Sequence, residues 1–94
     1  MTAKQFLEVS EESLSTIRRE ASELLNAALI GRGVDDATRG RMVAYLHDRL
    51  EIVPRAGGPE IRVRLKGDSL PFGAATIGRL VNKAIAESAA RRTS

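Results

Sequence analysis

Residues 60–66 (EIRVRLK) alternate strictly between apolar and charged side chains. Because side chains on a β-strand point to opposite faces in turn, the pattern predicts a strand with one buried face and one solvent-facing row of cations. The buried face would carry Ile61, Val63 and Leu65. Such a strand is unstable unless its apolar face is covered, so the rest of the chain is expected to supply that cover.

A second, shorter strand is expected just before this one. Residues 51–53 precede Pro54, and the residue before a proline avoids the helical region. Pro54 also has no amide hydrogen for a sheet ladder, so the strand is expected at an edge or to stop there. Residues 55–59 (RAGGP) have the composition of a turn. We therefore predict a two-stranded antiparallel β-hairpin, ended after residue 66 by Gly67, Asp68 and Ser69.

Helical periodicity precedes the hairpin. The first helix is expected to be capped by Ser10, to carry Glu11 and Glu12 in its first turn, and to end at a left-handed Gly31. Asp35 or Asp36 is expected to cap the second helix, which a short loop turns back as an antiparallel partner. The predicted buried stripes are Leu14, Ile17, Ala21, Leu24, Leu25 and Ala28 in the first helix, and Met42, Val43, Leu46 and Leu50 in the second.

A third helix is expected after the hairpin, with Asp68 or Ser69 as its cap and Pro71 in its first turn. Its predicted buried stripe is Ile77, Leu80, Val81, Ala84 and Ile85. The fold class is thus α+β, in the order α-α-β-β-α around one aliphatic core. The 94 residues predict a single domain over 1–94, with an arm at 1–9 and a frayed tail at 90–94.

Composition narrows the environment and the chemistry. The chain has no cysteine, which excludes disulfides and thiolate zinc sites and favours a reducing compartment. It shows neither a secretory signal nor a membrane-spanning run, so a cytoplasmic protein without membrane contact is expected. The net charge is +3, and residues 51–94 carry 8 basic against 4 acidic groups. This charge excess is milder than that of a dedicated polyanion binder.

The outer face of the alternating strand is the first candidate site. Arg62, Arg64 and Lys66, with Arg55 at the turn, would be spaced about 6.5–7 Å apart along the strand. Arginine forks suit phosphate, so the row is a candidate for nucleic acid. It is equally a candidate for the acidic surface of a protein partner. A third interpretation is a solvated sheet face, since cations commonly guard exposed strands against aggregation.

A flank of the third helix is the second candidate. Its small residues would allow a close approach by a second copy of the chain or by the first helix. The residues predicted for self-association are Ala75, Gly78, Arg79, Asn82, Ala86 and Ala89.

Catalytic groups are sparse. His47 is the only histidine, and adjacent Asp48 would point away from it on a helix. No metal-ligand spacing occurs, so no metal or cofactor is expected. Asp68-Ser69-Leu70 resembles the Asp-Ser-Leu of acyl carrier proteins, which implies a serine that carries a phosphopantetheine arm at a helix start. That resemblance covers three residues only.

Together these features favour a non-catalytic interaction module. It would act as an adaptor, an inhibitor or regulator, or an assembly component, docked on a larger protein or paired with itself as a homodimer. The alternative is a nucleic-acid-binding protein that uses the basic hairpin. A carrier protein or a small enzyme is the third hypothesis.

Overall fold

The structure, a computed structural model, describes residues 11–93. These residues form three helices and a three-stranded antiparallel sheet, which confirms the α+β class and the order helix, helix, strands, helix. The predicted arm at residues 1–9 and the predicted Ser10 cap lie outside the described residues. The elements are α2 (Glu11–Gly31), α3 (Asp36–Arg49), β1 (Leu50–Val53), β2 (Glu60–Leu65), β3 (Asp68–Pro71) and α4 (Ala74–Thr93).

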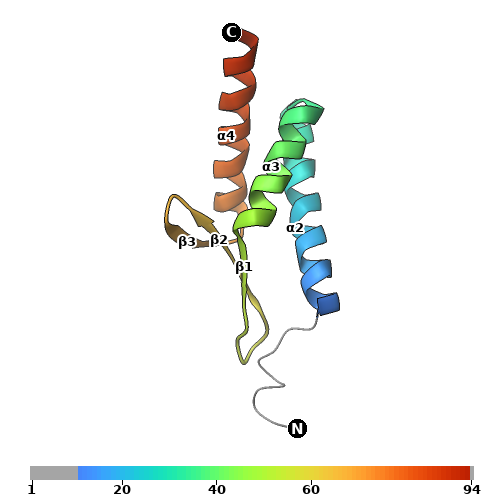
Figure 1. Cartoon of the computed structure of the whole chain (residues 1–94), viewed down its shortest axis with the longest axis vertical. Helices are drawn as coiled ribbons and strands as arrows, with labels where there is room; N and C mark the ends of the chain where they lie inside the picture. Colours follow the sequence, from blue (N-terminus) through green and yellow to red (C-terminus); the bar gives the residue numbers. More distant parts are fainter. Residues whose placement is uncertain (1–10, 94) are drawn as a thin grey trace.

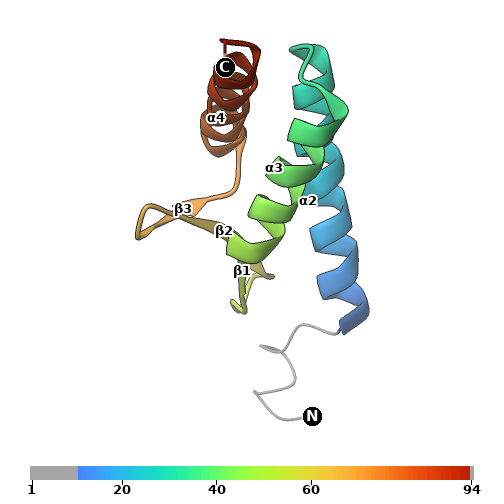
Figure 2. The same cartoon turned by 45° about the horizontal axis from the view of Figure 1, so that its top comes forward.

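The helices are arranged side by side, with the sheet at one end (Figures 1 and 2). α2 and α3 run antiparallel across a four-residue connection, as the short loop predicts. α3 passes directly into β1, and α4 returns from the sheet to pack against both other helices. α4 continues to Thr93, beyond the start of the tail that the sequence predicts to fray.

The predicted two-stranded hairpin is wrong in one respect, because a third strand follows it. Lys66 (φ 51°) and Gly67 (φ 85°) form a two-residue turn, and both have the positive φ of a type I′ hairpin turn. The chain then pairs back on β2, with Arg64 opposite Ser69. Asp68 and Ser69 therefore lie in β3 and cap no helix, which also removes the helix start that an acyl carrier serine needs.

The strand pairing gives the sheet one apolar and one polar face. β1 pairs with β2 through Leu50 opposite Val63 and Glu51 opposite Arg62. β3 places Leu70 opposite Val63 on the other side. Leu50, Val63 and Leu70 therefore share one face across all three strands, because directly opposed residues point the same way. The predicted inward alternation of β2 is confirmed, with Val63 and Leu65 buried.

The core joins all three helices to β2. Two details of the predicted first helix are wrong. Leu24 is 56% exposed, whereas Leu29, one helical turn beyond Leu25, is fully buried, so the buried stripe follows Ala21, Leu25 and Leu29. The left-handed glycine is Gly33 (φ 72°), two residues beyond the predicted Gly31. The buried apolar residues are Ala21, Leu25, Leu29, Val34, Met42, Leu46, Leu50, Val63, Leu65, Leu80, Val81 and Ala84.

Asp35 caps α3, which agrees with the prediction that either Asp35 or Asp36 would be the cap. Its Oδ2 accepts a hydrogen bond from the Thr38 amide (3.0 Å), and its Oδ1 accepts from the Thr38 hydroxyl (2.8 Å). The Ser88 hydroxyl on α4 also donates to Oδ1 at 3.1 Å. The cap thus links the start of α3 to α4. These hydrogen bonds, the Thr38 hydroxyl foremost, lower the pKa of Asp35 from 3.8 to about 2.

We expect Asp35→Ala to lower the midpoint of thermal unfolding by roughly 5 °C at neutral pH. The pKa is depressed in the folded state, so the stabilisation is complete above the unfolded value of 3.8 and is lost as the pH falls through about 2. The variant should therefore differ less from the wild type at pH 2 than at pH 6. Calorimetry at both pH values measures this, with Asp36→Ala as the neighbouring control. An equal loss at the two pH values would contradict the cap.

Candidate interaction site

The predicted cationic row is internally paired on the polar face of the sheet. Arg62 donates from Nη1 to Glu60 Oε1, from Nε to Ser69 Oγ and from Nη2 to the Ser69 carbonyl, each at 2.7 Å. Arg55 donates to the other Glu60 oxygen at 3.0 Å. The hydrogen bonds from Arg62, and then those from Arg55, hold the pKa of Glu60 below its usual value. The carboxylate thus remains ionised between two guanidinium groups.

The third arginine has its own carboxylate. Arg64 Nη2 donates to Glu51 Oε2 at 3.1 Å, and Ser69 Oγ donates to Glu51 Oε1 at 3.3 Å. Three guanidinium groups therefore face two carboxylates across the three strands. We call this set the hairpin network; it consists of Glu51, Arg55, Glu60, Arg62, Arg64 and Ser69. The row is not the bare cationic face that the alternation alone suggests, although its binding of a partner remains a prediction.

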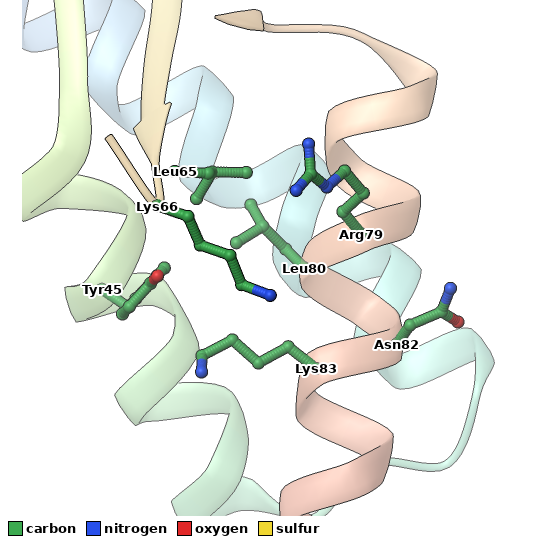
Figure 3. Close-up of a pocket in the computed structure, with 7 residues that line it drawn as sticks. All are labelled: Tyr45, Leu65, Lys66, Arg79, Leu80, Asn82 and Lys83. Atoms are coloured by element: carbon green, nitrogen blue, oxygen red, sulfur yellow. The ribbon is translucent and has the colours of Figure 1, made fainter. Parts of the chain in front are cut away.

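Lys66 does not belong to the row of cations on β2. As the first residue of the β2–β3 turn it projects from the end of the strand into a pocket between α3 and α4 (Figure 3). The pocket has a volume of about 430 Å³, within the range of ligand sites in proteins. We call it the cationic pocket; its lining residues are Tyr45, Leu65, Lys66, Arg79, Leu80, Asn82 and Lys83.

Three cations and no carboxylate line this pocket. Within residues 11–93, Lys66 and Arg79 enter no ion pair, and Lys83 meets only Glu87, at 3.8 Å. Figure 3 shows the Lys83 side chain extending toward Tyr45 and the Lys66 side chain extending toward α4, whereas Asn82 points away from both. The Lys83 ammonium lies 5.2 Å from the centre of the Tyr45 ring, and Arg49 lies 3.7 Å from it. A concave surface lined by one sign of charge concentrates the field and attracts anions.

The predicted self-association flank of α4 lies open to solvent. Ala75, Gly78, Arg79, Asn82, Ala86 and Ala89 are all exposed. A Cβ placed on Gly78 would meet no atom within 4 Å, so this flank is not the close contact with α2 that the sequence also allowed. α4 packs inward instead through Leu80, Val81 and Ala84, as predicted. Arg79 and Asn82 belong to both the flank and the cationic pocket, so the two surfaces are continuous.

His47 is engaged in a structural contact. Its Nε2 is hydrogen-bonded to Ser22 Oγ, and the Ser22 hydroxyl donates to the Arg18 carbonyl. His47 Nε2 is then the donor toward Ser22, the reverse of the polarity that activates a serine nucleophile. Among residues 11–93, no group of three or more His, Cys, Asp or Glu side chains is placed to hold a metal ion. None of the described helices combines the length and apolar character required to cross a bilayer.

Sequence reasoning missed Tyr45 and Lys83. Lys83 follows Arg79 by four residues, a spacing that puts both on one helix face and was available in the sequence. Lys66 and Tyr45 line the same pocket because of where the β2–β3 turn lies relative to α3 and α4, which local spacing does not reveal.

Comparisons of the chain with protein-family models, with curated proteins and with solved structures returned no match.

Proposed function

We propose that this chain is a non-catalytic interaction module that docks a protein partner with an acidic surface on the cationic pocket and the adjoining flank of α4. One observation carries the proposal: Lys66, Arg79 and Lys83 line one pocket that contains no carboxylate. In contrast, Arg55, Arg62 and Arg64 are each paired with Glu51 or Glu60. Lys66 and Arg79 enter no ion pair within residues 11–93, and Lys83 meets only Glu87, at 3.8 Å, so this pocket has positive charge left to complement an acidic partner.

The same charges argue against self-pairing as the main role. In a twofold dimer the same patch meets itself, so the cations of both copies would lie within one interface. Like charges brought together cost free energy, which a partner with carboxylates would instead recover. We therefore place the docking of a different protein ahead of the homodimer. The cytoplasmic location expected from composition is part of the proposal and stands on the sequence alone.

Two double variants that each remove two cations test the proposed surface. We expect Arg79→Ser/Lys83→Ser to reduce capture of partner proteins from the native cell extract at least about tenfold, because both charges meet the partner. Arg55→Ser/Arg64→Ser should capture the same proteins as the wild type, since those groups are neutralised internally. Quantitative mass spectrometry of the captured proteins compares the three chains.

The reverse pattern would contradict the proposal. If the hairpin variant lost capture and the α4 variant kept it, the hairpin network would be the contact surface. Binding to duplex DNA with a log–log salt slope near −3 to −4 would support the nucleic-acid hypothesis instead, with four cations each on one phosphate. A stable dimer in sedimentation, abolished by Arg79→Ser/Lys83→Ser, would point to self-association.

A further inference from the structure

The backbone of Lys66 is the unusual feature of the cationic pocket. Among residues 11–93 it is the one non-glycine residue with a positive φ (51°). The first position of a type I′ turn favours Asn, Asp or Gly, and the lysine Cβ is crowded in this left-handed conformation. Gly67 (φ 85°) already satisfies the second position. A residue held against its conformational preference points to a role for its side chain, here the one that reaches the pocket.

The charge of the pocket indicates the ligand. One carboxylate from a partner would leave most of the charge of Lys66, Arg79 and Lys83 uncompensated. A phosphate monoester carries close to two negative charges at pH 7 on three acceptor oxygens. Its oxygens suit a pocket lined by two ammonium groups and one arginine, because charge-assisted hydrogen bonds from lysine and arginine to phosphate are strong. Tyr45 lies on the same lining.

From these observations we infer that the cationic pocket is a receptor for a phosphate monoester group, with Lys66, Arg79 and Lys83 as its ligands. This inference rests on the proposed function, because it names the group that the partner presents at the same surface. The flank of α4 continues from the pocket through Arg79 and Asn82, so it offers a path for the chain that carries the phosphate. A free phosphorylated molecule would use the same three cations without contacting the flank.

The test uses the full chain and its own tyrosine. Tyr45 is the only tyrosine and there is no tryptophan, so the intrinsic fluorescence reports on the pocket directly. Inorganic phosphate, a phosphoserine peptide and the same peptide with glutamate in place of phosphoserine are titrated at constant ionic strength. Calorimetry repeats each titration. We expect saturable binding of phosphate near about 1 mM, and tighter binding of the phosphopeptide if the group comes from a protein.

Lys66→Asn separates binding from folding. Asparagine is favoured at this turn position, so the variant should melt a few degrees higher than the wild type while it binds phosphate about tenfold more weakly. Arg64→Asn is the matched control, since it removes one exposed cation from β2, two residues before Lys66. It should leave phosphate affinity unchanged because Arg64 belongs to the hairpin network.

The outcomes distinguish the two proposals. Absence of saturable phosphate binding at 10-fold above the expected dissociation constant of about 1 mM, or equal weakening by Lys66→Asn and Arg64→Asn, overturns the inference. Equal affinity for the glutamate and phosphoserine peptides also overturns it, but leaves the acidic-partner proposal standing. Binding of inorganic phosphate without binding of either peptide supports the phosphate site and contradicts the docked protein partner.

Discussion

Leu25→Ala should lower the free energy of unfolding by about 3 kcal/mol, a large share of the stability of a domain of this size. Leu25 is fully buried on α2, at the centre of the core that joins α2 to α3, α4 and β2. Its truncation loses transfer free energy and leaves a cavity that the surrounding helices fill only in part. Urea unfolding followed by circular dichroism measures the change.

Leu24→Ala is the control for this effect. The same substitution one residue earlier removes a side chain that is 56% exposed, so it should cost less than about 0.5 kcal/mol. The two variants together test which face of α2 is buried, because the sequence pattern places both Leu24 and Leu25 in the core. Comparable losses at the two positions would mean that the buried stripe is the one predicted from periodicity.

Arg62→Ala should destabilise the chain by about 1.5 kcal/mol, because the change breaks a network that spans the sheet. Arg62 is 24% exposed and donates to Glu60 and twice to Ser69, so it ties β2 to β3. Its loss leaves the partly covered Glu60 and the Ser69 carbonyl with fewer donors. The free energy of unfolding in urea is again the measured quantity.

Arg64→Ala serves as the comparison. Arg64 is 56% exposed and makes one ion pair at 3.1 Å with Glu51, so its removal should cost less than about 0.5 kcal/mol. If neither variant were destabilised, the arginines of β2 would be available to a ligand, as the alternating pattern alone suggests.

Periodicity was sufficient to predict most of the fold. The three helices, the inward face of β2 and the inward stripe of α4 follow from residue spacing, because burial on a regular element repeats with its period. β3 was missed because Lys66 is an uncommon residue for a type I′ turn, although the following glycine was a signal for one. With that turn recognised, Asp68 and Ser69 would have been assigned to a strand and not to a helix cap.

The candidate site was harder to predict, because a cation on a strand is available to a partner only if no nearby carboxylate pairs with it. Glu60 precedes Arg62 by two residues, so the alternation itself placed a carboxylate on the cationic face. The pairing of Glu51 with Arg64 depended on strand register, which the predicted hairpin left open. The cationic pocket required the positions of α3, α4 and the β2–β3 turn together, and these are set by tertiary packing.

The most direct test of the account is a titration of the isotope-labelled chain with phosphoserine, followed by the amide resonances in two-dimensional NMR. If the cationic pocket is the binding surface, the largest shifts will fall on residues 65–67 and 79–83 and on Tyr45. Shifts centred on Arg55, Arg62 and Arg64, with the α4 resonances unmoved, would instead identify the polar face of the sheet as the binding surface and contradict the account.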